Sequence, residues 1–451
     1  MVSIGFVYFC SVIKNNYELQ NDGTMKNILS KRTFIVLPLF LFSLHPLWGQ
    51  KSNFKNDICI PGKLYMLSDI RNDVFVEALI KRWRPYNDFV RFSGDCVYSR
   101  KLNRVASVDT PVDGSNMKIE LVNSDEFEII KEKAISICVG KKGIGTQEVT
   151  VQILGDSFVN GAFFRDALLS KNYIPGIKLV GLRNIKNEEG QYDEGRGGWT
   201  VKKYFEIPKG EMTSYHGYMQ PVGEYRYWGS CEFWKNCYKV INGELTDTEI
   251  VYNCGRYDQC ITKFDKETGY LAAPKKNDLM YDNARGSYMV YTGKKWKNVE
   301  VDERKWAFNY RKYLDMWNLD APKFFAQMLG LNDYRDSLTA EMKESYYKAV
   351  PDGKFIILIP CTTCGSLNNV RGDFTLRQNA SMWQLRKNII DTFDGRESEG
   401  YYVVDIGITI DNEKGYNRNR DGIQTGNPHP YPNYPTMGIP LAAFIQYYRE
   451  L

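Results

Sequence analysis

From Val149 onward the chain alternates short apolar runs with helical patterns, and this alternation constrains the fold more than any other feature. Nearly continuous apolar runs are typical of strands buried on both faces. Five such strands are predicted at residues 149–154, 177–182, 324–329, 355–360 and 401–406. Strands of this kind alternating with helices indicate a parallel sheet covered by helices. Ligand sites in such sheets lie outside the carboxyl ends of the strands.

The first of these strands ends at a turn that presents a serine, Gly155-Asp156-Ser157. The following residues, 158–170, have helical spacing, so Ser157 is expected at a strand-to-helix junction. The N-terminus of a helix offers backbone N–H groups to a developing oxyanion. Gly-Asp-Ser is also a common turn composition, so the tripeptide alone does not identify a site. Further helices are predicted at 308–317, 337–349, 376–393 and 437–448.

Residues 51–148 show a different pattern, with short runs of period-two alternation separated by turn signals. Runs at 64–67, 89–92, 117–121 and 134–139 are examples. Several short strands without a long helix indicate a β-sandwich domain. We find no catalytic constellation in this segment, which could pack against the following domain or help to hold a polymer.

Residues 1–50 resemble a targeting leader. A basic segment at 25–32 precedes an apolar run at 33–48, and Gly49 offers a cleavage point, with Met25 as the expected start. The apolar run is short for a membrane span, although an uncleaved N-terminal anchor is an alternative. No later stretch is apolar enough to cross a bilayer, so no stable membrane insertion is expected after cleavage. The expected compartment is periplasmic or extracellular.

The composition limits the classes of molecule that the protein is expected to bind. The net charge of +5 is small for 451 residues and no dense Lys/Arg cluster occurs, which argues against nucleic acid. Aromatic residues make up 14% of the chain, with 31 Tyr and 9 Trp. Cores use some of these rings, and carbohydrate-binding surfaces also favour them.

A long insertion is expected at about 201–305, between the second and third strands. It contains Cys231, Cys237, Cys254 and Cys260. Export permits disulfides, and these spacings are wider than those of common zinc sites, so disulfides within the insertion are predicted. Its aromatic side chains could shape a binding surface or could pack inward, and the sequence leaves both possibilities open. The six most prominent are Tyr225, Tyr227, Trp228, Phe233, Trp234 and Trp296.

Three further pieces follow strands or lie in loops near the expected site. Residues 194–200, EGRGGWT, contain glycines that let a backbone N–H approach a substrate oxygen. Asn332 in GLND can donate a side-chain hydrogen bond to an oxyanion. His429 precedes Pro430 and the last helix. The other two histidines are His45 in the leader and His216 in the insertion, so His216 and His429 are the two imidazole bases available after export.

This ordered set resembles the SGNH (GDSL-type) hydrolase superfamily over residues 149–451. The family's four named residues correspond to Ser157, Gly198, Asn332 and His429. The resemblance implies a three-layer αβα, flavodoxin-like domain with a five-stranded parallel sheet. It also implies a Ser157 nucleophile, a His429 base, and an oxyanion hole from Ser157, Gly198 and Asn332. No metal or organic cofactor is implied.

One departure concerns the catalytic acid. The family usually places an Asp three residues before the catalytic His, and Gly426 stands there in this chain. Asp421 is the nearest replacement, Asp405 is another, and a backbone carbonyl could also orient the imidazole. We expect Asp156 and Asp333 to fix turns rather than to transfer protons.

The EGRGGWT segment and the β-rich segment before the hydrolase-like part resemble secreted bacterial members that act on polysaccharides. The expected function is therefore that of an exported serine esterase that removes short acyl groups, above all acetyl, from a polysaccharide or oligosaccharide. A lipase- or thioesterase-like SGNH hydrolase is one alternative. A non-catalytic glycan-binding protein is another, which Gly426 favours and the four retained site residues oppose.

Overall fold

The computed structural model describes residues 57–80, 88–100, 104–123, 126–145, 147–161, 163–169, 172–184, 191–210, 214–246, 257–333, 335–361, 377–411, 414–417, 420, 429–431 and 434–449. All of them belong to one compact unit, Asn56–Leu451. The predicted leader, including His45, lies outside the described residues. The predicted division at residue 148 falls inside this unit and stays a prediction.

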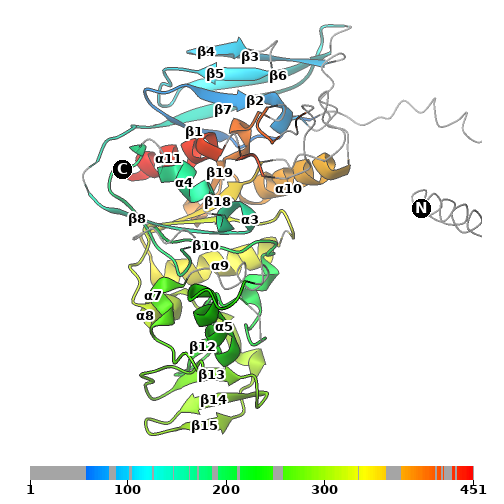
Figure 1. Ribbon diagram of the computed structural model, residues 1–451. Coiled ribbons are helices and arrows are strands. Elements are labelled where there is room, and N and C mark those ends of the chain that lie inside the picture. The colour runs from blue at the N-terminus through cyan, green and yellow to red at the C-terminus, as the bar shows by residue number, and fades with distance from the viewer. Residues whose placement is uncertain are drawn as a thin grey trace, which may run out of the picture. The chain divides into compact units, whose positions relative to one another are not determined.

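A parallel sheet forms the centre of the unit (Figure 1). Its strands run in the order β10-β8-β17-β18-β19, and β9 also pairs with β8. Every pairing in the sheet is parallel. The strands are β8 (Val149–Gly155), β9 (Ile177–Leu179), β10 (Glu194–Gly195), β17 (Phe324–Met328), β18 (Lys354–Ile359) and β19 (Tyr401–Asp405). The predicted α/β class and the parallel sheet are confirmed.

The sheet has six strands where the sequence predicts five. The second predicted strand ends at Leu179 as β9, which pairs with Val149–Val151 of β8. The chain then leaves the edge and returns as β10, which pairs with Leu154 and Gly155. Two short segments therefore share one edge of β8, and β10 is too short for its period to be seen in the sequence.

Helices cover both faces of this sheet. One face packs on α4 and α11, and the other on α8, α9 and α10. Their bounds are α4 (Phe163–Leu169), α8 (Tyr310–Trp317), α9 (Asp336–Ala349), α10 (Arg377–Phe393) and α11 (Tyr434–Arg449). The helix predicted at 158–170 is divided, because the four-residue α3 (Ser157–Asn160) ends at Gly161 before α4 begins.

The β-rich segment forms two sheets, ordered β1-β7-β6-β3 and β2-β5-β4, with one shared apolar core. Ile408 of η8 (Gly407–Thr409) joins this core. The strands are β1 (Lys63–Leu67), β2 (Asn72–Phe75), β3 (Asp88–Gly94), β4 (Val97–Arg100), β5 (Val105–Val108), β6 (Asn116–Asn123) and β7 (Ile129–Gly140), with η2 (Val76–Ala78) after β2. The close packing of β7 on α11 requires Gly140, because a Cβ there would lie 2.2 Å from the Ala443 carbonyl oxygen.

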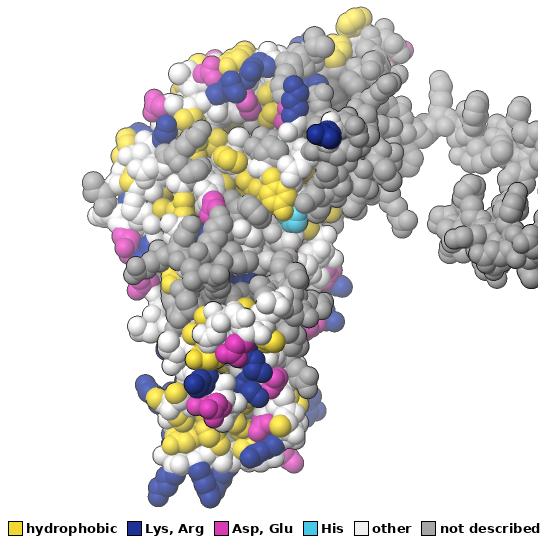
Figure 2. All heavy atoms as spheres, viewed as in Figure 1, with side chains coloured by type: hydrophobic (Ala, Val, Ile, Leu, Met, Phe, Trp, Pro, Cys, Tyr) yellow, Lys and Arg dark blue, Asp and Glu magenta, His cyan; other side chains and the backbone are white. Residues whose placement is uncertain are grey.

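The insertion builds a second structural layer beside the parallel sheet. A four-stranded sheet, β12-β13-β14-β15, and a β11-β16 pair form its strands. The elements are η4 (Lys202–Phe205), β11 (Met219–Pro221), β12 (Arg226–Ser230), α5 (Cys231–Ile241), α7 (Asp258–Ile261), β13 (Asp278–Asp282), β14 (Ser287–Tyr291), β15 (Trp296–Val299), η5 (Glu303–Lys305) and β16 (Trp306–Phe308). On the face in Figure 2, charges of both signs intermix over the described residues.

Most of the aromatic side chains of the insertion pack inward. Trp234 stacks on Phe264 with ring centroids 3.9 Å apart, and both rings are buried. Of the six aromatic residues singled out from the sequence, Tyr225 and Trp296 are partly exposed and the other four are buried. The insertion therefore has a core of its own, built mainly from aromatic rings.

The predicted disulfides of the insertion are not confirmed. Cys231 has a free, buried thiol, and burial raises its pKa to about 12. Cys254 lies outside the described residues.

A buried ion pair joins the β-rich segment to the sheet. The guanidinium of Arg386 in α10 pairs with Asp405 at the end of β19, and both side chains are at most 3% exposed. Its Nε donates to the Cys59 carbonyl oxygen at 2.7 Å. The start of the β-rich segment, α10 and the end of β19 therefore meet at this one side chain.

We predict that Arg386→Met lowers the free energy of unfolding by about 3–5 kcal/mol, because Asp405 would be left charged and unpaired. Urea unfolding measures this change. Lys387→Met is the matched control, since its pair with Asp391 is 36% and 57% exposed. The control should change stability by less than about 1 kcal/mol. Equal losses in the two variants would contradict the role of the pair.

Candidate active site

Ser157 is the first residue of α3, directly beyond the carboxyl end of β8, and it is partly exposed. Asp156 caps the helix, its Oδ1 accepting from the Phe158 backbone N–H at 3.1 Å. The tight turn requires Gly155, because a Cβ there would lie 2.5 Å from the Val159 side chain and 2.9 Å from the Met328 carbonyl oxygen. The sequence GDS thus folds into a turn that leaves the serine side chain at the sheet edge.

The glycine-rich segment follows β10 along the neighbouring edge of β8. A Cβ on Gly195 would lie 2.3 Å from the Asn160 backbone nitrogen, so this glycine lets β10 pack against α3. The Arg196 N–H donates to the Gly155 carbonyl oxygen at 2.8 Å. Gly198 is exposed, with a φ of +69° that favours glycine. The turn that carries Gly198 is therefore fastened directly to the turn that carries Ser157.

Asn332 lies in the loop after β17, on the other side of β8. Its Nδ2 donates to the carbonyl oxygen of Trp199, next to Gly198, at 3.0 Å. Asp333 in the same loop pairs with Arg335 at 2.9 Å. The structure thus brings the loops of Ser157, Gly198 and Asn332 together at the carboxyl ends of adjacent strands.

His429 lies beside the serine turn. Its ring centroid is 4.9 Å from that of Phe158, the residue after Ser157. Burial lowers the pKa of His429, which favours the neutral imidazole that can accept a proton.

His216 occupies a different environment. It is buried, its Nδ1 accepts from the Tyr218 N–H at 3.3 Å, and its Nε2 lies 2.9 Å from the Glu206 carbonyl oxygen. Burial lowers its pKa to about 3. Both ring nitrogens have protein partners, so His216 has a structural role.

Of the two aspartates considered as the catalytic acid, the structure describes only Asp405. Asp405 is occupied by the Arg386 ion pair and also accepts from the Ile408 N–H at 3.3 Å. Asp421 and Gly426 lie outside the described residues.

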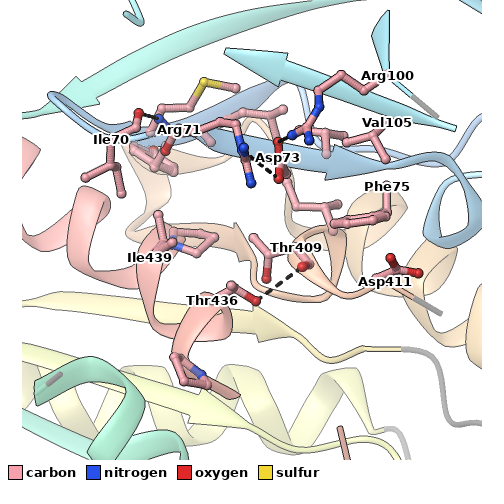
Figure 3. Close-up of a pocket in the computed structure, with 18 of the residues that line it drawn as sticks. Ile70, Arg71, Asp73, Phe75, Arg100, Val105, Thr409, Asp411, Thr436 and Ile439 are labelled. Atoms are coloured by element: carbon pink, nitrogen blue, oxygen red, sulfur yellow. Dashed lines mark hydrogen bonds and ion pairs between the residues drawn. The ribbon is translucent and has the colours of Figure 1, made fainter. Parts of the chain in front are cut away.

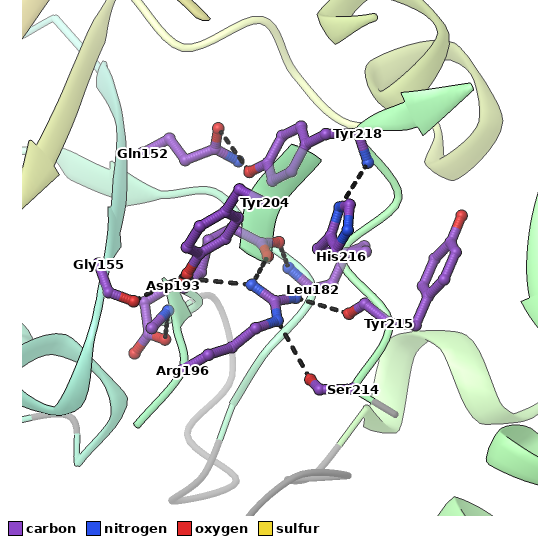
Figure 4. A network of polar contacts seen from close by, with 12 residues as sticks. Gln152, Gly155, Leu182, Asp193, Arg196, Tyr204, Ser214, Tyr215, His216 and Tyr218 are labelled. Carbon is purple, nitrogen blue, oxygen red and sulfur yellow. Dashed lines mark hydrogen bonds and ion pairs between the residues drawn. The ribbon is translucent and has the colours of Figure 1, made fainter. Parts of the chain in front are cut away.

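A buried polar network contacts the backbone next to the serine turn (Figure 4). Glu194 and Arg196 are at most 1% exposed and pair at 2.8 Å. The Glu194 carboxylate also accepts from the Leu182 N–H at 2.7 Å and the Tyr313 hydroxyl at 2.6 Å. The sequence analysis missed this pair, although the opposite charges two residues apart in EGRGGWT are a signal for it. The hydrogen-bond partners of Glu194 and Arg196 lie too far along the chain to be inferred from the sequence.

Arg196 and Tyr204 extend the network to the insertion and to the serine turn. The Arg196 guanidinium donates to the Tyr215 carbonyl oxygen at 2.7 Å and to Ser214 Oγ at 3.2 Å. The Tyr204 hydroxyl lies 2.8 Å from the Gly155 carbonyl oxygen and 2.6 Å from that of Glu194. The backbone on both sides of the site is thereby held by buried side chains.

No protein-family model and no curated protein sequence matches this chain. A solved structure of a carbohydrate esterase family 3 protein from Talaromyces cellulolyticus is 13% identical, covering 67% of this chain and 99% of its own, with a TM-score of 0.28. A proposed alpha-galactosidase/melibiase from Bacteroides fragilis is 9% identical, covering 67% of this chain and 52% of its own, with a TM-score of 0.18. TM-scores this low do not establish a shared fold.

Asp156 should make stability depend on pH. Burial raises its native pKa to about 7, above the ordinary value of 3.8, and the Phe158 N–H offsets this only in part. The native state therefore holds this proton more tightly than the unfolded chain does. Its stabilising contribution is complete below about pH 3.8 and is lost as the pH rises through 7.

We compare the unfolding free energy of Asp156→Asn, which cannot ionise, with that of the native protein. We predict that the difference grows in favour of the variant by about 1–3 kcal/mol as the pH is raised from 5 to 8. Urea unfolding at several pH values measures the difference between the two proteins. Burial also raises the pKa of Asp193 to about 7 and lowers that of His216. These two groups affect the native protein and the variant equally, so their effects cancel in the difference. A second variant, Asp156→Ser, keeps a capping oxygen and should show the same trend. A difference that stays constant with pH would refute the prediction.

Proposed function

We propose that this protein is a serine ester hydrolase of the SGNH (GDSL-type) kind. The observation that carries the proposal is the meeting of the Ser157, Gly198 and Asn332 loops at the carboxyl edge of the sheet, with His429 against Phe158. The strand order supports it, since β9-β8-β17-β18-β19 is the order expected of a flavodoxin-like domain.

In the proposed reaction, neutral His429 takes the proton of Ser157, and the serine oxygen attacks an ester carbonyl. The backbone N–H groups of Ser157 and Gly198 hold the oxyanion together with the Asn332 amide. One Nδ2 hydrogen of Asn332 is directed to Trp199, and the other serves the oxyanion. The tetrahedral intermediate then collapses and expels the alcohol of the ester, which takes the proton from His429. Water, giving its proton to His429, attacks the acyl-enzyme, and release of the carboxylic acid returns that proton to Ser157. This sequence of steps needs no metal or organic cofactor.

Asp421 is the proposed orienting acid for His429. Asp405 is a poor candidate because its carboxylate already balances the buried Arg386 guanidinium. A backbone carbonyl that accepts from the imidazole remains the alternative partner.

The proposed substrate is a short acyl ester, acetyl above all, on a polysaccharide met outside the cytoplasm. The leader-like residues 1–50 support export, and the partly exposed Tyr225 and Trp296 leave two rings of the insertion for sugar contacts. Most other rings of the insertion are buried, so its main contribution is to brace the site. Within the described part of the chain, no helix has the length and apolarity needed to span a bilayer.

We predict that Ser157→Ala and His429→Ala each lower turnover of p-nitrophenyl acetate by about a thousandfold or more. The double variant should be no slower than the worse single variant, because the two residues act as one unit. No described residue forms a hydrogen bond with the Ser157 side chain. The Ser157→Ala variant should therefore have the same unfolding temperature as the native protein. Ser136→Ala, at a partly exposed serine of β7, is the control and should keep full activity. Additive losses, or activity within a few-fold of native, would exclude the assignment.

The acyl specificity has its own test. We expect kcat/KM to fall steeply from acetyl to octanoyl esters, and acetate to be released from acetylated xylan or pectin. Chromatography of released acetate measures the second outcome, with the Ser157→Ala protein as the blank. Faster turnover of octanoyl esters without acetate release would favour a lipase-like enzyme. Glycan binding with no turnover of any ester would favour a non-catalytic binding protein.

A further inference from the structure

A cavity of about 540 Å³ opens where the β-rich segment meets η8 and α11 (Figure 3). One wall comes from β2, β4 and β5, which supply Asp73, Arg100 and Val105. The opposite wall comes from η8 and the first turns of α11, which supply Thr409 and Ile439. Ser157, Gly198, Asn332 and His429, the proposed site residues that the structure describes, do not line it. Its volume is in the range of small-molecule sites, about 300–1,000 Å³.

Charge distinguishes this cavity from an ordinary gap between packed segments. Among the residues that the structure describes, its lining contains four cationic side chains and two acidic ones. The cationic residues are Arg71, Arg100, Lys142 and Lys414, and the acidic ones are Asp73 and Asp411. The excess of positive charge favours an anionic ligand.

Asp73 positions the two guanidinium groups. Its carboxylate lies 3.1 Å from Arg71 Nε and 3.7 Å from Arg100 Nη1. Figure 3 shows Arg71 and Arg100 converging on Asp73 at one side of the cavity. Each guanidinium has five N–H donors, and one carboxylate has too few lone pairs to occupy ten of them. Two oriented forks with spare donors suit bidentate binding of a carboxylate.

The rest of the lining provides an apolar surface for the body of the ligand. Phe75, Val105 and Ile439 contribute hydrocarbon, and the Thr409 and Thr436 side chains lie beside them. A sugar ring has one broad apolar side and a polar rim, which matches this mixture.

We propose that this cavity binds an acidic sugar, with the carboxylate of a uronic acid held by Arg71 and Arg100. The choice of a sugar rests on the proposed polysaccharide substrate, whereas the choice of an anion rests on the lining alone. The cavity would then hold a uronic acid unit of the polymer at a place separate from the Ser157 site.

Isothermal titration calorimetry of the full chain with digalacturonate tests the proposal, because this probe has no ester and its binding does not depend on hydrolysis. We expect digalacturonate to bind, neutral cellobiose to show no measurable heat, and the affinity to fall as salt is raised. Arg71→Gln and Arg100→Gln should each weaken binding about tenfold or more, as expected for charge-assisted hydrogen bonds. Arg71→Lys keeps the charge without the fork and should bind more weakly than the native protein.

Arg304→Gln is the matched control, since it removes the same charge from a side chain that is 90% exposed in η5 and outside the cavity lining. It should bind digalacturonate as the native protein does. Arg71 and Arg100 are 50% and 36% exposed, so their variants should fold, and thermal unfolding checks this. Absence of digalacturonate binding, equal binding of cellobiose, or equal affinity of the arginine variants and the control would overturn the proposal. Inorganic sulfate binding as tightly as digalacturonate would overturn the assignment to a sugar.

Discussion

The buried ion pair between Glu194 and Arg196 is the interaction on which the arrangement of the site depends. Two charges removed from water are tolerated only when nearly all their hydrogen bonds are satisfied. Here the partners come from separate parts of the chain: Leu182 after β9, Tyr313 in α8, and Ser214 and Tyr215 in the insertion. Satisfying the pair therefore fixes these segments around the carboxyl end of β8.

This requirement explains why the insertion is built around an aromatic core. The segment that supplies Arg196 with acceptors must itself be held in place, and packed rings do so with little loss of side-chain freedom. Tyr215 links the ion pair to the aromatic core. Its carbonyl oxygen accepts from Arg196, and its ring centroid lies 5.4 Å from that of Trp234. The same core leaves few rings for a substrate. Rigid support of the turns that carry Ser157 and Gly198 is thus a better physical description of the insertion than a surface on which sugar rings stack.

The sequence predicted the elements that have a periodic or continuous apolar pattern. It did not predict the contacts between residues that are distant along the chain. The strands β8, β17, β18 and β19 were found because buried parallel strands are continuous apolar runs. The loops of Ser157, Gly198 and Asn332 were expected at one edge because parallel strands end there together. The two-residue β10 has no detectable period, and the break after α3 depends on backbone geometry at Gly161. The Tyr313 hydroxyl bond to Glu194 spans 119 residues, a pairing that no local pattern encodes.

The buried Arg386–Asp405 ion pair bears on the choice of a carboxylate partner for His429. Asp405 is the last residue of β19, at the same carboxyl edge of the sheet, so its place in the sheet alone would make it a candidate partner for His429. Arg386 changes this, because a carboxylate that neutralises a buried guanidinium cannot turn to an imidazole without leaving that cation unpaired, at a cost of several kcal/mol. The Arg386 Nε also holds the Cys59 carbonyl oxygen, so this carboxylate is committed to joining the β-rich segment to the sheet. Of the two aspartates considered, Asp405 is thereby disfavoured, and Asp421 is left as the proposed carboxylate partner of His429.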